Sequence, residues 1–65
     1  MKINLRELRL ENNISVRGLA KLSGVSASAI SRIENEGVTP SLLTICKLRC
    51  ALNVGIEKMV DCEEE

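Results

Sequence analysis

Apolar residues recur along the chain in a pattern that predicts short helices. An apolar residue, a capping residue and a second apolar residue five positions after the first occur together five times. This arrangement is a hydrophobic staple across an N-cap, which fixes how the chain enters a helix. Asn13, Gly24 and Asn53 stand where a left-handed residue would end a helix, and Gly37 or Glu36 would end the third, glycine more easily. We therefore predict five helices, over residues 5–12, 16–23, 27–35, 40–52 and 56–60.

The predicted helix starts differ in their capping residues. Glu7 falls at the third helical position of the first helix, where it would complete a capping box. Pro40 would take the first helical position of the fourth, which is where proline fits in a helix. No stretch alternates cleanly in the manner of a strand, so the predicted fold class is all-α. The staples pair Ile3 with Leu8 across Asn4, Ile14 with Leu19 across Ser15, Val25 with Ile30 across Ser26, Val38 with Leu43 across Thr39, and Val54 with Met59 across Gly55.

Helical periodicity also selects a core. With 65 residues and no aromatic side chain, this core is light, and one domain is the most that the chain can build. A chain of this length buries only about 60% of the surface that its unfolded form exposes. We expect a folding stability of only a few kcal/mol, which dimerisation would raise. The predicted core comprises Leu5, Leu8, Ile14, Leu19, Ala20, Val25, Ile30, Ile33, Leu42, Ile45, Leu48, Leu52, Val54 and Met59.

The formal net charge of zero conceals an uneven distribution of charge. Residues 1–60 hold all nine basic side chains and five acidic ones, a net charge of +4, whereas residues 61–65 hold four acids. We therefore expect a domain at 1–60 and an acidic C-terminal tail at 61–65, solvated and frayed. A cationic body suits a polyanionic partner.

The residue types that are missing exclude several functions. The chain has no histidine, the commonest proton shuttle and metal ligand. Without aromatic residues it also lacks stacking platforms for single-stranded nucleic acid. We therefore predict no catalytic residues, no cofactor, no metal and no small-molecule ligand, and hence no enzyme. No signal peptide or membrane span is evident, so we expect no membrane partner, a cytoplasmic protein and reduced thiols.

Residues 16–35 predict two helices joined by a turn at 23–26. Helices that cross at roughly 90–120° through so short a turn come into close contact. Ala20 is small enough to allow this contact, and Gly24 tolerates the positive φ that the turn needs. The segment is therefore typical of a helix-turn-helix.

Three motifs in register carry a resemblance to a known family. They are Leu19-Ala20-x-x-x-Gly24-Val25-Ser26, then Ile30-Ser31-Arg32-Ile33-Glu34-Asn35, then Pro40-Ser41-Leu42. Together with the opening Leu5-Arg6-x-Leu8-Arg9 and the closing Leu52-x-Val54, they resemble the helix-turn-helix domain of the Cro/C1 phage-repressor family, also called the XRE family. The resemblance covers about residues 5–60 and implies a compact five-helix, lambda-repressor-like domain with the helix-turn-helix at helices two and three.

The resemblance also implies which residues contact DNA. In the family, the third helix lies in the major groove, where its first turn and a residue one turn later contact base edges. Arg32 is the one side chain there able to bind guanine through two hydrogen bonds. Phosphates are contacted at the start of helix two, where backbone N–H groups also contribute, and at the end of helix three. The DNA-binding residues expected on this basis are Ser15, Arg17, Ser26, Ala27, Ser28, Ser31, Arg32 and Asn35.

An arginine–glutamate pair of the family falls here on Arg9 and Glu34. The resemblance implies that the two meet as a largely buried, bidentate ion pair that orients the recognition helix. Removing one partner of such a pair costs about 3–5 kcal/mol, because the other charge is left without a partner.

Several of these residues have a plainer interpretation. Arg32 could be an ordinary solvated arginine, and Ser15 and Ser26 are N-caps first, a role compatible with DNA contact. Cys46 and Cys50 lie four residues apart on one predicted helix and could offer two thiolates to a metal, with only Cys62 beyond them. We expect them instead to be small apolar residues, Cys46 buried and Cys50 exposed.

The function that the sequence best supports is a small, sequence-specific transcriptional regulator, a repressor that binds operator DNA as a homodimer. Helix three would lie in the major groove of double-stranded DNA. The alternative is a protein-interaction module of the same fold, such as an antitoxin, anti-repressor or adaptor with weak DNA binding. Three features favour that alternative: Val16, where the family usually has glutamine, the short side chains of Ala27 and Ala29, and the acidic tail at 61–65.

Overall fold

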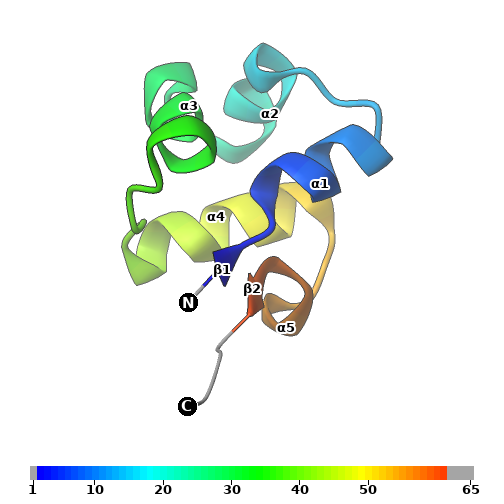
Figure 1. Ribbon diagram of the computed structural model, residues 1–65. Coiled ribbons are helices and arrows are strands. Elements are labelled where there is room, and N and C mark those ends of the chain that lie inside the picture. The colour runs from blue at the N-terminus through cyan, green and yellow to red at the C-terminus, as the bar shows by residue number, and fades with distance from the viewer. Residues whose placement is uncertain (1, 62–65) are drawn as a thin grey trace.

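The structure is a computed structural model that describes residues 2–61, and short helices make up most of it (Figure 1). Over these residues the five predicted helices are confirmed, each within two residues of its predicted bounds. A pair of short strands was not predicted. In chain order the elements are β1 (Lys2–Ile3), α1 (Leu5–Glu11), α2 (Val16–Ser23), α3 (Ala27–Glu36), α4 (Leu42–Leu52), α5 (Ile56–Met59) and β2 (Val60–Asp61).

The helix α4 runs through the centre of the arrangement (Figure 1). It packs against α2 on one side and against α5 on the other. The helix α2 also contacts α3, and α3 contacts α1. The predicted all-α architecture, with a helix-turn-helix at α2 and α3, is therefore confirmed apart from the strands.

The strands β1 and β2 bring the two ends of the described chain together. They pair antiparallel, with Lys2 opposite Asp61 and Ile3 opposite Val60. The N–H of Asn4 continues the ladder, because it donates to the carbonyl oxygen of Met59 at 2.8 Å. Asp61, which we assigned to the acidic tail, thus forms part of a strand, and the rest of that predicted tail, residues 62–65, lies outside the described residues.

The N-caps of α2, α3 and α4 are serines whose hydroxyl oxygens accept a backbone hydrogen bond. Ser15 and Ser26 were predicted, but α4 begins after Ser41, whose Oγ accepts from the N–H of Thr44 at 3.2 Å. The predicted cap Thr39 and the helical position of Pro40 are therefore wrong. Both residues precede the helix. Ser41 is the N-cap because its hydroxyl oxygen can accept from a backbone N–H of the first turn.

Asn4 precedes α1 without a side-chain capping bond. Its amide nitrogen instead donates to the carbonyl oxygen of Lys58 at 3.2 Å and lies 3.4 Å from Oδ2 of Asp61. The predicted capping box with Glu7 is therefore not formed. Asn4 holds α1 to the strand pair and to α5 instead.

Residues in the left-handed region end or follow four of the helices, as predicted. Asn13 (φ +55°), Gly24 (+77°), Gly37 (+68°) and Asn53 (+56°) adopt this conformation. Glu36 is still helical, so Gly37 is the residue that ends α3. The short loops that follow set the directions of the next helices.

The buried core is a subset of the predicted one. Ile14, Ala20 and Val54 are half-buried and pack against its edge. Leu42 was predicted to be buried but is 69% exposed. It is the first residue of α4 and lies outside the buried stretch of that helix, which begins at Ile45. The buried residues are Leu5, Leu8, Leu19, Val25, Ile30, Ile33, Ile45, Leu48, Leu52 and Met59.

Candidate nucleic-acid interface

The turn between α2 and α3 is braced by its own hydrogen bonds. The N–H of Gly24 donates to the carbonyl oxygen of Ala20 at 2.9 Å. The hydroxyl of Ser23 donates to the carbonyl oxygen of Leu19 at 2.7 Å and accepts from the N–H of Val25 at 3.1 Å. Because these bonds all close within a few residues, the relative direction of α2 and α3 is set locally.

The helix α3 turns one side to the core and the other to solvent. Ile30 and Ile33 are buried, whereas Ser28 and Arg32 are exposed. The fully exposed side chains of α3 are therefore all polar. Of the predicted DNA-binding residues, Ala27 and Ser31 are half-buried, and the exposed ones are Ser15, Arg17, Ser26, Ser28, Arg32 and Asn35.

The first turn of α2 presents backbone N–H donors at its N-terminus. Ser15 caps it by accepting from the N–H of Gly18 at 3.0 Å. A Cβ on Gly18 would lie 3.2 Å from Oγ of Ser15 and 3.3 Å from Cγ2 of Ile14, so a larger residue would disturb the cap. The N–H groups of Val16 and Arg17 have no acceptor within the helix, and such groups bind anions.

Arg9 and Glu34 form the predicted ion pair between α1 and α3. Nε and Nη2 of Arg9 donate to Oε2 and Oε1 of Glu34, each at 2.9 Å, and Nη1 donates to the carbonyl oxygen of Ile14 at 3.0 Å. The side chains are 12% and 2% exposed, so the pair is largely buried and bidentate, as expected. Hydrogen bonding to Glu34 raises the pKa of Arg9 above its ordinary value, against the opposing effect of desolvation. The pair fixes the C-terminal half of α3 on the domain.

Arg6, which was not among the predicted site residues, also reaches α3. Its Nη2 donates to Oδ1 of Asn35 at 3.0 Å, and Nδ2 of Asn35 donates to Oγ of Ser31 at 3.1 Å. Two of the predicted DNA-binding residues are thus joined to each other and to α1. One available signal was spacing, because Arg6 and Arg9 lie three residues apart on one face of α1, and Arg9 was expected to pair with Glu34 of α3.

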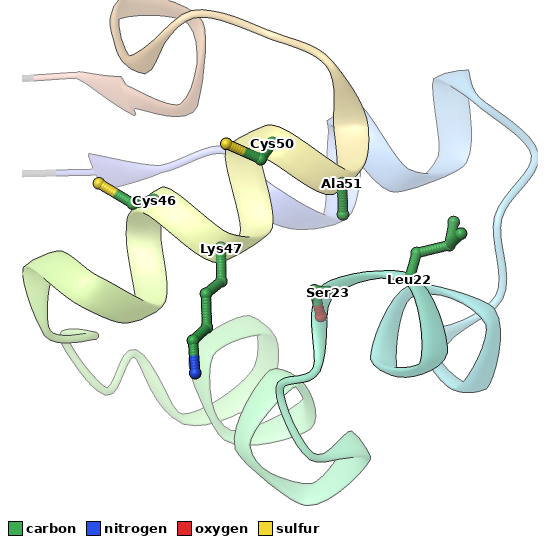
Figure 2. A pocket seen from close by; sticks show the side chains of 6 residues that line it. All are labelled: Leu22, Ser23, Cys46, Lys47, Cys50 and Ala51. Atoms are coloured by element: carbon green, nitrogen blue, oxygen red, sulfur yellow. The ribbon is translucent and has the colours of Figure 1, made fainter.

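Cys46 and Cys50 lie at a different surface. They line an open pocket between α2 and α4 together with Leu22, Ser23, Lys47 and Ala51 (Figure 2). Cys50 is exposed, as expected, but Cys46 is only half-buried, and both are free thiols. Their sulfur atoms point toward the same side of α4 (Figure 2). Cys62 lies outside the described residues.

Neither metal ligation nor membrane insertion finds a candidate in the described part of the chain. Residues 2–61 contain no cluster of three or more cysteine, aspartate or glutamate side chains placed to hold a metal ion. No helix among them has the length and apolar character needed to cross a bilayer.

The pair α2–α3, its braced turn and the exposed outer side of α3 define a helix-turn-helix. A family model described as "Helix-turn-helix" matches residues 5–59. The chain belongs to the Cro/C1-type (XRE) helix-turn-helix family.

Proteins similar in sequence are regulators by name. The chain is 50% identical over 58 residues to the HTH-type transcriptional repressor RghR of Bacillus subtilis (strain 168), a match that covers 86% of this chain and 42% of RghR. It is 46% identical over 44 residues to the HTH-type transcriptional regulator PuuR of Escherichia coli (strain K12), covering 68% of this chain and 24% of PuuR. The chain thus spans less than half the length of these relatives.

A solved structure shares the fold. The crystal structure of the restriction-modification controller protein C.AhdI from Aeromonas hydrophila superposes with a TM-score of 0.79 at 36% sequence identity. The match covers 85% of this chain and 83% of that one. The arrangement of elements described above is therefore shared with this controller protein over most of the length of both chains.

Proposed function

We propose that this chain is a DNA-binding transcriptional regulator, a repressor that acts in the cytoplasm as a homodimer on operator DNA. The helix α3 would lie in the major groove, with Arg32 and Ser28 at base edges and Ala27 near a thymine methyl group. Ser15, Arg17 and the free N–H groups of α2 would bind the phosphates beside the groove. Two recognition helices would then meet half-sites one turn of the duplex apart, about 34–36 Å.

The observation that carries the proposal is the way in which α3 is presented. Ile30 and Ile33 bury one side of the helix, and the Arg9–Glu34 pair fastens its C-terminal half. Its outer side is left exposed and polar, with Arg32 as a free-standing cation in the described structure. The names of the two relatives, a transcriptional repressor and a transcriptional regulator, support the same function.

The test is binding of the full chain to duplex DNA as the salt concentration rises. A regulator loses affinity steeply, because each neutralised phosphate contributes a slope of about −0.9 to the plot of log affinity against log salt. Arg32→Ala is expected to lose roughly 1–3 kcal/mol of binding to a DNA fragment flanking the protein's own gene, if that fragment holds the operator. Lys58→Ala, on the exposed side of α5, is the matched control and should bind as the unaltered protein does.

The alternative function is that of a protein-interaction module with the same fold and weak DNA binding. Half-buried Val16 and Ala27 offer few hydrogen bonds to DNA, which is the observation in its favour. It predicts almost no binding to mixed duplex DNA even at low salt. A flat salt titration would therefore overturn the proposal.

A further inference from the structure

The guanidinium of Arg6 lies where α1 meets the last turn of α3. Its Nη2 donates to Oδ1 of Asn35 at 3.0 Å, and its Nε lies 3.6 Å from Oε1 of Glu34. The Arg6 side chain nevertheless remains 55% exposed. It is thus held at a fixed place on the surface of α3 while most of it still faces solvent.

The charges around Arg6 do not cancel. Glu34 is one carboxylate with two arginines beside it, so the three side chains carry a net charge of +1. Arg9 takes both oxygens of Glu34 at 2.9 Å, whereas Arg6 lies at the longer distance of 3.6 Å. Because Arg9 is also the more buried of the two, the unbalanced positive charge belongs to Arg6 and faces outward.

The donors around Arg6 are also incompletely used. A guanidinium has five N–H donors, and among residues 2–61 only Asn35 accepts a hydrogen bond from this one. Asn35 is held at both ends of its amide, because its Oδ1 accepts from Arg6 and its Nδ2 donates to Oγ of Ser31 at 3.1 Å. The second N–H of that Nδ2 has no acceptor among residues 2–61. Unfilled donors from two helices therefore gather one turn away from Arg32.

We propose that Arg6 binds a backbone phosphate of duplex DNA and positions the Asn35 amide to donate to the same stretch of backbone. This inference rests on the proposed function and adds a phosphate-binding site on α1 to it. A guanidinium fork matches two phosphate oxygens, which an ammonium group matches less well. Since Asn35 already holds the side chain in place, less side-chain entropy is lost when the phosphate binds.

If Arg6 were only a structural link between α1 and α3, here called a strut, its removal would affect a different measurement. Exposed ion pairs and hydrogen bonds stabilise a fold little, and a strut would act on unfolding alone. A phosphate ligand acts on the salt dependence of DNA binding, because each phosphate contact releases counterions. The two roles are therefore separated by measuring both quantities on one variant.

The experiment uses the full chain and a fluorescent mixed-sequence DNA duplex, with binding followed by anisotropy at several NaCl concentrations. Arg6→Gln is expected to reduce the magnitude of the salt slope by about 0.9 per bound protomer and to leave the melting temperature close to that of the unaltered protein. Arg6→Lys should restore most of the slope. Lys58→Gln removes the same charge from α5 and should change neither quantity.

Asn35→Ala tests the positioning role. If Arg6 acts on Asn35, adding Asn35→Ala to Arg6→Gln should weaken binding by less than Asn35→Ala does alone. Fully additive losses would overturn the positioning role of Arg6.

Two results would overturn the phosphate contact, and they differ in what else they imply. If the unaltered protein binds with a steep salt slope and Arg6→Gln has the same slope, the contact is wrong and the proposed function stands. If the unaltered protein does not bind the duplex at low salt, both are wrong.

Discussion

Replacing Arg9 by alanine tests the contact that fastens α3 to the domain. The substitution removes two 2.9 Å hydrogen bonds to Glu34 and a third, of 3.0 Å, to the carbonyl oxygen of Ile14. It leaves a carboxylate whose side chain is only 2% exposed without its bidentate partner. The cost of such a change is dominated by the charge that stays behind in a poorly hydrated place.

The expected loss of unfolding free energy is about 3 kcal/mol, the lower end of the range for breaking a buried pair. The lower end applies because Arg6 lies 3.6 Å from Oε1 of Glu34 and partly compensates for the lost charge. A domain of this length has a total stability of about 3–10 kcal/mol, so the variant would keep only a fraction of it. At about 4 °C or more per kcal/mol for small domains, the melting temperature should fall by at least about 12 °C.

Urea unfolding followed by far-ultraviolet circular dichroism measures this loss directly. Arg6→Ala is the matched control, since it removes the other arginine beside the same carboxylate from an exposed site and should cost no more than about 1 kcal/mol. Replacing Arg9 by methionine and Glu34 by leucine together should recover most of the loss, because no charge is then left buried. A loss for Arg9→Ala as small as that of Arg6→Ala would refute the reasoning.

The same assay checks two further expectations. Ser26→Ala removes the cap that accepts from the N–H of Ala29 at 3.2 Å and should cost about 0.5–2 kcal/mol, whereas Ser26→Asp should restore most of it. An equal loss for both variants would contradict the capping role. Leu48→Ala opens a cavity in a fully buried site and should cost about 2–5 kcal/mol, whereas Leu42→Ala, at a residue 69% exposed, should change the stability by less than about 0.5 kcal/mol. Comparable losses at the two leucines would mean that Leu42 is covered in solution.

The helices were predictable because their signals are local. Ser15 and Ser26 cap the helices that follow them, and Gly24 adopts the positive φ that its place in the turn required. Each of these effects depends on residues within about one helical turn. Such short-range chemistry can be recognised in a sequence without knowing the rest of the fold.

The start of α4 was missed because two capping patterns overlap there. Thr39 and Ser41 are capping residues only two positions apart, and the pattern alone favoured Thr39 through its staple between Val38 and Leu43. In the structure that staple is not buried, since Val38 is 45% and Leu43 is 64% exposed.

The strands could not be predicted from local pattern, and the contact of Arg6 with Asn35 depends on tertiary packing. The pair β1–β2 consists of two residues on each side, too few to show any alternation, and joins opposite ends of the described chain. Arg6 has a partner only because α1 packs on α3. The Arg9–Glu34 pair was predictable through the family resemblance, whereas the DNA contacts of Ser28, Arg32 and their neighbours remain predictions.

The pairing of Lys2 with Asp61 makes the domain nearly circular. A short linker between these two positions would close the backbone, and new ends could be opened at the exposed Asn12 and Asn13, between α1 and α2. The rearranged chain would keep α2, the turn and α3 contiguous, and α1 would return to its place last. In such a circular permutant the elements would be synthesised in a different order, but α2 and α3 would present the same surface to DNA.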